Sequence, residues 1–135
     1  MAGYSGTPLV KKLGLKTGHR VRTLGEPADY LDLVDPLPPG IVVSGRISAD
    51  IDVVHFFTKS AAELEDRLPR LMGMIRQDGM IWVSWPKKSS GVVTDVTEDT
   101  VREHALPLGL VDVKVCAVDE TWSGLKLVIR KELRT

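Results

Sequence analysis

Two short polar segments of this 135-residue chain combine residue types that can hold a small ligand. Positions 84–90 read Ser-Trp-Pro-Lys-Lys-Ser-Ser, and positions 119–122 read Asp-Glu-Thr-Trp. A lysine can neutralise a phosphate or carboxylate, and a tryptophan ring can stack on a planar molecule. The predicted ligand is therefore small and anionic or planar. The predicted ligand-binding residues are Ser84, Trp85, Lys87, Lys88, Ser89, Ser90, Asp119, Glu120 and Trp122.

The same segments also have a purely structural interpretation. Lys87 and Lys88 would then pair with Asp119, Glu120 or Asp95 to fasten a long loop, and the tryptophans would cap the core. Long loops at the ligand-binding edge of an α/β sheet often carry function, which favours the ligand-binding interpretation. Both interpretations stay open at this point.

No catalytic set is recognisable. Ser84 and Ser89 lack the Gly-x-Ser-x-Gly elbow of a hydrolase. Cys116 is the only cysteine, and its position within an expected strand predicts a buried, inert thiol. His55 lies near the end of an apolar strand and is interpreted as a core histidine rather than a general base. No two histidines have the spacing of metal ligands. We expect no metal and no cofactor, and the sequence favours a non-catalytic protein.

Hydrophobic patterning predicts one α/β domain over residues 1–135. Segment 51–57 is nearly all apolar, which is typical of a parallel strand covered on both faces. The expected strands are 19–24, 41–43, 51–57, 80–85, 111–118 and 125–131. Because the link between the last two is short, that pair must be antiparallel. The expected fold class is a three-layer, Rossmann-like α/β fold with a mostly parallel sheet that ends in an antiparallel β-hairpin.

This arrangement positions the two polar segments. In an open α/β sheet, ligands bind outside the carboxyl ends of the parallel strands. The expected strands 80–85 and 111–118 run parallel, and each ends at one of the polar segments. We therefore expect both segments at the same edge of the sheet.

Composition indicates which classes of binding partner and which cellular compartment to expect. The chain carries 18 basic and 18 acidic residues, and this balance argues against a dedicated nucleic-acid binder. A single cysteine, the lack of an apolar signal region and the lack of a bilayer-length apolar run predict a cytoplasmic protein with no membrane partner. Residues 1–6 and 87–95 are the candidate disordered pieces. The cations that precede the first carboxylate, Glu26, are interpreted as a solvated basic helix face. They are Lys11, Lys12, Lys16, Arg20 and Arg22.

A parallel Rossmann-like sheet closed by a β-hairpin resembles the fold of the S-adenosylmethionine-dependent methyltransferases. Segment 21–24 would be their first strand, 51–57 their fourth, 80–85 their fifth, and the hairpin their sixth and seventh. Segment 41–50 is too short to hold their second strand, the following helix and their third strand. The resemblance therefore implies a shortened version of that fold.

The cofactor motif of those enzymes is incomplete here. They place a G-x-G-x-G run after the first strand, where this chain reads Leu-Gly-Glu-Pro-Ala-Asp over 24–29. Gly25 is interpreted as a turn residue. Their ribose-binding acidic residue should fall near 44–46, where the charged residue is Arg46. The usual cofactor site is thus disfavoured, which moves the expected site to the ends of 80–85 and 111–118.

Three longer stretches are similar to a family of small bacterial proteins, a domain of unknown function that is frequent in actinobacteria. The stretches are Gly-Tyr-Ser-Gly-x-Pro-Leu at 3–9, the segment 82–90, and the segment 113–126. The resemblance covers nearly the whole chain. It implies a fold rather than an activity.

Three functions remain open. The leading hypothesis is a non-catalytic or regulatory domain that binds a small anionic or planar ligand at the carboxyl edge of the sheet. The second is a divergent S-adenosylmethionine-dependent methyltransferase. The third is a protein-interaction module, a homodimer included, in which the terminal hairpin pairs with a partner strand. One side of that hairpin carries Leu125, Leu127 and Ile129.

Overall fold

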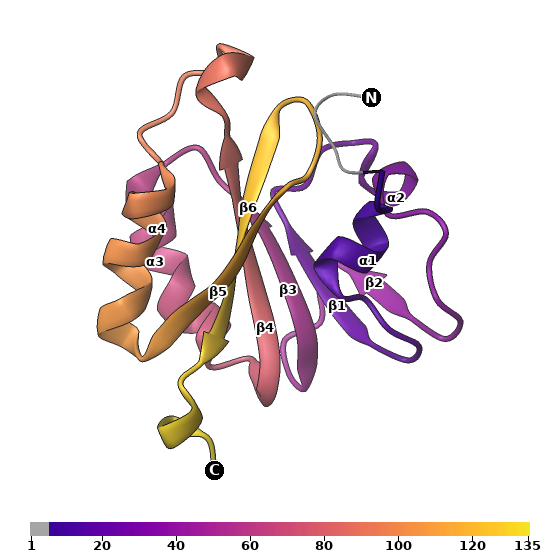
Figure 1. The fold of residues 1–135 in the computed structure, drawn as a ribbon. Helices are drawn as coiled ribbons and strands as arrows, with labels where there is room; N and C mark the ends of the chain where they lie inside the picture. The colour runs from indigo at the N-terminus through magenta and orange to yellow at the C-terminus, as the bar shows by residue number, and fades with distance from the viewer. Residues whose placement is uncertain (1–5) are drawn as a thin grey trace.

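Six β-strands form one continuous sheet with helices on both faces (Figure 1). The computed structural model describes residues 6–135. The strands are β1 (Arg20–Leu24), β2 (Val42–Ser44), β3 (Ile51–Phe57), β4 (Ile75–Pro86), β5 (Leu110–Ala117) and β6 (Trp122–Ile129). The α-helices are α1 (Leu9–Leu13), α2 (Tyr30–Leu33), α3 (Ala61–Met72) and α4 (Glu98–Ala105). The short 3-10 helices are η1 (Lys88–Ser90), η2 (Leu106–Leu108) and η3 (Lys131–Leu133).

The strand order is β2–β1–β3–β4–β6–β5. Strands β1 to β4 pair in parallel, and β6 runs antiparallel to both β4 and β5. This topology confirms the expected fold class, a mostly parallel sheet with a terminal antiparallel hairpin. Strand β2 lies on one side of β1, and the next strand along the chain, β3, lies on the other side of β1. The carboxyl edge beside β1 is therefore the kind of position where α/β proteins bind ligands.

Strand β4 begins at Ile75, earlier than the expected start at Met80. The segment before Met80 pairs with β3 as well, with a shift in register after Ile51. A Cβ at Gly79 would stand 3.0 Å from the carbonyl oxygens of Arg76 and Ile51. Glycine is therefore needed at position 79 for this close packing inside the strand.

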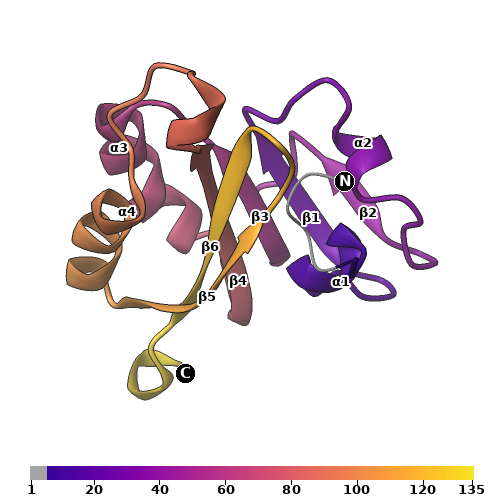
Figure 2. The same cartoon turned by 45° about the horizontal axis from the view of Figure 1, so that its top comes forward.

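Each face of the sheet packs against its own pair of helices, which Figure 2 shows on opposite sides. On one face, Leu64 and Leu68 of α3 and Val101 of α4 are fully buried against β3, β4 and β6. On the other face, α1 and α2 cover Trp82. The indole Nε1 of Trp82 donates a hydrogen bond of 3.0 Å to the carbonyl oxygen of Leu13, which ties α1 to β4.

The terminal hairpin presents a different surface from the one expected. Strand β6 lies inside the sheet, between β4 and β5. Its apolar side belongs to the core under α3 and α4, where Leu125, Leu127 and Ile129 are at most 4% exposed. The free edge is that of β5, on which Val113 and Val115 are half-exposed. A partner strand would therefore have to pair with β5.

Two segments were candidates for disorder. Residues 1–5, which make up most of the first candidate, lie outside the described residues. Segment 87–95 forms η1 and then packs against the start of α3. There Ala61 N donates to Asp95 Oδ1 at 2.7 Å, and Thr94 Oγ1 donates to the carbonyl oxygen of Lys59 at 2.8 Å. Within residues 6–135, no helix has the length and apolar character needed to cross a membrane.

Gly25 closes the end of β1 against the end of β3. Its φ is +69°, in the left-handed region that favours glycine, and a Cβ there would collide with the carbonyl oxygen of Phe57. The interpretation of Gly25 as a turn residue is confirmed. Glycine is required at this position by the left-handed backbone conformation and by the close approach to Phe57 of β3.

We expect Gly25→Ala to lower the free energy of unfolding by about 3 kcal/mol, because it combines backbone strain with overpacking. Gly91→Ala is the matched control, since Gly91 has a φ of +74° and nothing within 4 Å of a Cβ. The control should cost about 1 kcal/mol, from strain alone. Urea unfolding measures both values. Equal losses in the two variants would contradict a role for the contact with Phe57.

Candidate functional site

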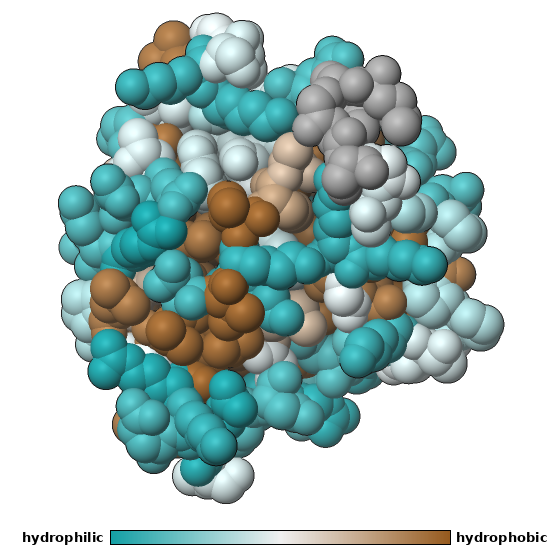
Figure 3. All heavy atoms as spheres, in the orientation of Figure 1, coloured by the Kyte–Doolittle hydropathy of each residue, from teal (hydrophilic) through white to brown (hydrophobic). Residues whose placement is uncertain are grey.

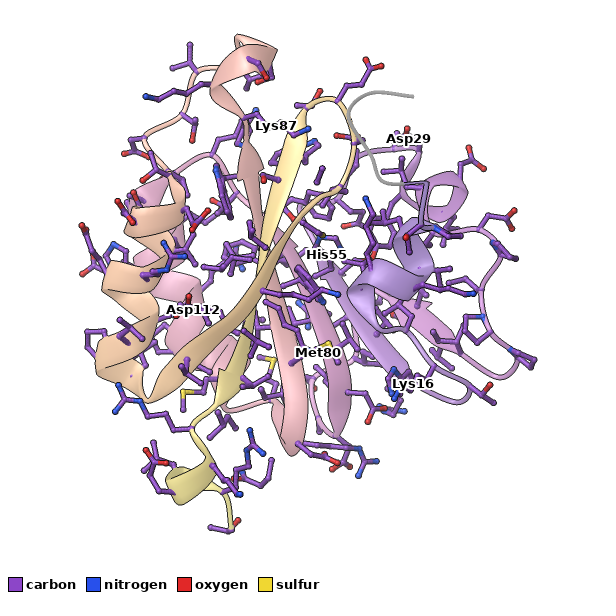
Figure 4. All side chains as sticks on the ribbon, in the orientation of Figure 1. Lys16, Asp29, His55, Met80, Lys87 and Asp112 are labelled. Carbon is purple, nitrogen blue, oxygen red and sulfur yellow. The ribbon has the colours of Figure 1, made fainter. Side chains whose placement is uncertain are left out.

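The two polar segments meet at the carboxyl edge of the sheet, as expected. Pro86 at the end of β4 pairs with Trp122 at the start of β6. The backbone N–H of Lys87 donates to the carbonyl oxygen of Thr121 at 2.8 Å. The side chain of Lys87 donates to the carbonyl oxygen of Asp119 at 2.7 Å. Figure 4 shows Lys87 at this edge, beside the turn between β5 and β6.

Lys87 and Asp119 hold this turn in place. One carboxylate oxygen of Asp119 accepts from the backbone N–H of Thr121 at 2.8 Å and from that of Trp122 at 2.7 Å. The bond from Lys87 goes to the backbone of Asp119 and not to its carboxylate. These contacts match the structural interpretation of the segments, in which a lysine fastens the loop. They leave Lys88, Ser89 and Glu120 as the exposed members of the predicted set.

The two tryptophans of the predicted set lie on opposite faces of the sheet. Trp85 is 7% exposed and belongs to the core under α3 and α4. Trp122 packs on the α1 and α2 side, with its ring edge-on to Phe57 at 5.1 Å between ring centroids. Ser84 is fully buried, and the Ser90 hydroxyl donates to the carbonyl oxygen of Lys87 at 2.6 Å. The structure therefore does not bring both indole rings to one pocket.

A cleft of about 300 Å³ opens at the same edge, at the ends of β1 and β2. We call it the β1–β2 cleft. It is lined by Thr23, Glu26, Pro27, Ala28, Tyr30, Leu31, Val43, Ser44 and Gly45. The sequence does not predict these residues as ligand-binding residues, because they form no familiar motif. The available signal was their position, since several of them directly follow the first two strands.

Glu26 gives the cleft its charge. Its exposed carboxylate accepts a hydrogen bond of 2.9 Å from the hydroxyl of Thr23. Ser44 adds a second hydroxyl at the end of β2, where its Oγ accepts from the backbone N–H of Arg46 at 3.1 Å. Leu31 and Val43 supply apolar wall. This lining can accept hydrogen bonds from hydroxyl or amine groups, and it disfavours an anion.

A buried polar network connects the wall of the cleft to the centre of the sheet. The hydroxyl of Tyr30 lies 3.0 Å from His55 Nδ1, and His55 Nε2 lies 2.8 Å from Ser84 Oγ. His55 also stacks on Phe57, with 4.2 Å between ring centroids. Figure 4 shows His55 in the middle of the sheet, away from Lys87. Both ring nitrogens have partners, so the interpretation of His55 as a satisfied core histidine is confirmed.

Burial keeps this network uncharged. It lowers the pKa of His55 from 6.5 to about 3, so the imidazole is neutral at physiological pH. Burial also raises the pKa of the Tyr30 hydroxyl, and the nearby carboxylate of Glu26 raises it further. A neutral imidazole between two hydroxyls holds α2 in place without any buried charge. Within residues 6–135, no group of three or more histidine, cysteine or carboxylate side chains could hold a metal ion.

The pKa of His55 predicts how stability depends on pH. The unfolded chain binds this proton below about pH 6.5, whereas the folded protein binds it only near pH 3. His55 therefore makes the fold less stable as the pH falls through this window, by up to about 1.4 kcal/mol per pH unit. His55→Gln should be less stable at pH 7 and should show a flatter decline between pH 6 and pH 4. Urea unfolding across this range gives both slopes, and subtracting them removes the shared effect of the carboxylates. Parallel slopes would contradict a neutral, buried His55.

Solved structures similar to this one are methyltransferases. Fibrillarin from Aeropyrum pernix, solved with bound S-adenosyl-L-methionine, matches with a TM-score of 0.62 and 12% identity over 93% of this chain and 70% of its own. A putative methyltransferase from Thermoplasma acidophilum matches with a TM-score of 0.59 and 7% identity, over 97% and 77%. The ribosomal protein L11 methylase of Lactobacillus delbrueckii subsp. bulgaricus gives 0.58 and 12%, over 90% and 75%. At such identities the likeness concerns the fold alone.

The sequence comparisons assign no activity to the chain. Among curated proteins, none matches the sequence. A family model described as a protein of unknown function, DUF3052, matches residues 43–131. This match covers β3 to β6 together with α3 and α4. It agrees with the resemblance of the sequence to a family of unknown function. The chain belongs to the DUF3052 family.

Proposed function

We propose that this chain is a non-catalytic domain that binds a small, nucleoside-like molecule in the β1–β2 cleft. The observation that carries the proposal is the carboxylate of Glu26, exposed beside the hydroxyls of Thr23 and Ser44 at the carboxyl ends of parallel strands. Ribose hydroxyls or an exocyclic amine donate well to such a carboxylate, and charge-assisted hydrogen bonds exceed neutral ones in strength. The size of the cleft suits a small ligand.

The proposal keeps the carboxyl edge and the planar character of the ligand expected from the sequence. Leu31 and Val43 offer apolar contact for a flat ring at the cleft wall. The negative charge of Glu26 favours a neutral or cationic molecule over an anion. The β1–β2 cleft includes none of the nine ligand-binding residues predicted from the sequence. Those residues remain a separate prediction, for a site beside the turn between β5 and β6.

S-adenosylmethionine does not fit the cleft in the manner usual for this fold. Only one glycine follows β1, and its turn is packed against the carbonyl oxygen of Phe57. The end of β2 reads Ser44, Gly45, Arg46, which supplies no carboxylate for ribose hydroxyls. The carboxylate at this edge comes instead from Glu26, in the loop after β1.

The groups that could have reacted are held in structural roles, which supports a non-catalytic domain. His55 and Ser84 are fully buried and bonded to each other. Burial raises the pKa of the Cys116 thiol, which favours the unreactive thiol over the thiolate. Neither side chain of the His55–Ser84 pair can touch a ligand in the cleft without a rearrangement of the core.

Calorimetry of the full chain with adenosine, S-adenosylhomocysteine and adenosine monophosphate tests the proposal. We expect adenosine to bind and the monophosphate to bind more weakly, because its phosphate approaches Glu26. Glu26→Gln should weaken adenosine binding about tenfold or more, since it replaces a charge-assisted hydrogen bond. The matched control is Glu120→Gln, which removes the same charge from the turn between β5 and β6 and should leave the affinity within twofold.

Two results would contradict the cleft as the site. One is the absence of heat with all three compounds at millimolar concentration. The other is a loss of affinity in Glu120→Gln or Lys88→Ala while Glu26→Gln binds normally. That second pattern would favour the site first predicted beside β4 and β6.

A divergent methyltransferase is the second candidate function, and the shared fold is the observation in its favour. It requires S-adenosylmethionine to bind and to be converted to S-adenosylhomocysteine. Mass spectrometry of the cofactor after incubation with the protein measures that conversion. Binding of S-adenosylmethionine with turnover would replace the non-catalytic proposal.

A further inference from the structure

Lysines from distant parts of the chain gather on the face of the sheet that α1 covers. Lys11 and Lys12 lie on α1, and Lys16 follows it closely. Lys114 on β5 and Lys126 on β6 face each other directly across the antiparallel pair. The sequence predicts a solvated helix face for the N-terminal lysines. The fold adds the two lysines of the hairpin to them.

Three of these lysines line a groove of about 430 Å³ between α1 and β5, which we call the basic groove. Lys11, Lys12 and Lys114 line it, together with Thr7, Val115 and Cys116. None of its described lining residues is acidic or aromatic. On this face of the molecule, a hydrophilic band runs across the middle, from β5 toward α1 (Figure 3).

The arrangement opposes the stability of the sheet. Like charges directly opposite each other on paired strands repel and destabilise the pairing. Partial burial lowers the pKa of Lys126, and the positive charges of Lys114 and Lys16 lower it further. The six ion pairs found within residues 6–135 all use arginine, so none of them neutralises Lys114 or Lys126.

Part of the negative charge of the chain lies on the other side of the sheet. Helices α3 and α4 together carry six carboxylates and three arginines. They cover the face opposite to α1. The described lining of the basic groove, by contrast, carries only positive charge, which attracts an external anion.

We propose that the basic groove binds a small molecule with two or more phosphate groups. Three lysines converge on the groove from α1 and β5, and lysine binds phosphate as a point charge without strict geometry. The lack of aromatic side chains in the described lining argues against base stacking, which single-stranded nucleic acids rely on. The bounded size of the groove favours a compact oligophosphate over a polymer.

The test uses sodium tripolyphosphate as the probe and the full chain in low-salt buffer. Calorimetry should show binding that weakens as salt is added. Lys11→Gln and Lys114→Gln, each at a lining residue, should each weaken it about tenfold, the loss expected for one charge-assisted contact. Lys131→Gln, at an exposed site in η3, makes the same change of net charge and should bind within twofold of the parent protein.

The single cysteine provides an independent readout inside the groove. Cys116 lines the groove and is partly exposed, whereas the sequence predicts a buried thiol. A neutral alkylating reagent such as iodoacetamide can therefore report its accessibility. Tripolyphosphate should slow the alkylation several-fold in the parent protein and in Lys131→Gln, but not in Lys114→Gln.

Three results would overturn the proposal. Tripolyphosphate could fail to bind at low salt, or Lys131→Gln could weaken binding as much as Lys114→Gln does, which would reflect net charge alone. Binding of a single-stranded oligonucleotide without binding of tripolyphosphate would assign the groove to a polymer instead. Adenosine binding in the β1–β2 cleft is independent of all three outcomes, because the two sites share no lining residue.

Discussion

A neutral imidazole in the middle of the sheet is the interaction on which the carboxyl edge of this protein depends. His55 has no exposed surface, and its two nitrogens lie within hydrogen-bond distance of Tyr30 and Ser84. The loss of either partner would leave a buried polar group unsatisfied, at a cost of about 1–3 kcal/mol. Through this link, one side chain holds α2, β3 and β4 together. Because Tyr30 also lines the β1–β2 cleft, the same link fixes the cleft wall.

The loop after β1 explains why ligand binding at this edge takes an unusual form. Gly25 turns the chain directly onto the end of β3, and the next residue, Glu26, carries its carboxylate into the cleft. In a nucleotide-binding fold this position normally offers bare backbone to the ligand. Here a charged side chain occupies it. The chain therefore keeps the position of a ligand site while changing its chemistry from backbone contact to side-chain recognition.

The molecule separates its charges. The β1–β2 cleft carries a carboxylate, the basic groove carries lysines, and helices α3 and α4 carry six carboxylates against three arginines. Composition alone does not reveal this separation, because the positive and negative residues are equal in number. Two sites of opposite charge on one small domain would select different ligands.

The sequence was sufficient to predict the fold but not the site. The apolar run 51–57 and the short link before β6 predict a buried central strand and an antiparallel hairpin, and both are confirmed. These features are local. The partners of His55 come from α2 and β4, and no local pattern connects them.

The positions of Trp85 and Trp122 show the same limit. Side chains alternate between faces along a strand, so their faces depend on the register between β4 and β6. The pairing of Lys114 with Lys126 likewise depends on the irregularity in β5 near Asp112. Register of this kind is set by packing over the whole sheet, and a single sequence does not reveal it.

Amide chemical-shift mapping by NMR, with adenosine added to the labelled protein, tests whether the β1–β2 cleft is the binding site. We expect the largest shifts at Ala28, Tyr30, Ser44 and Gly45, around the β1–β2 cleft. The amides of η1 and of the turn between β5 and β6 should stay nearly unchanged. The largest shifts at η1 and that turn, or no shifts at all at millimolar adenosine, would contradict binding in the cleft.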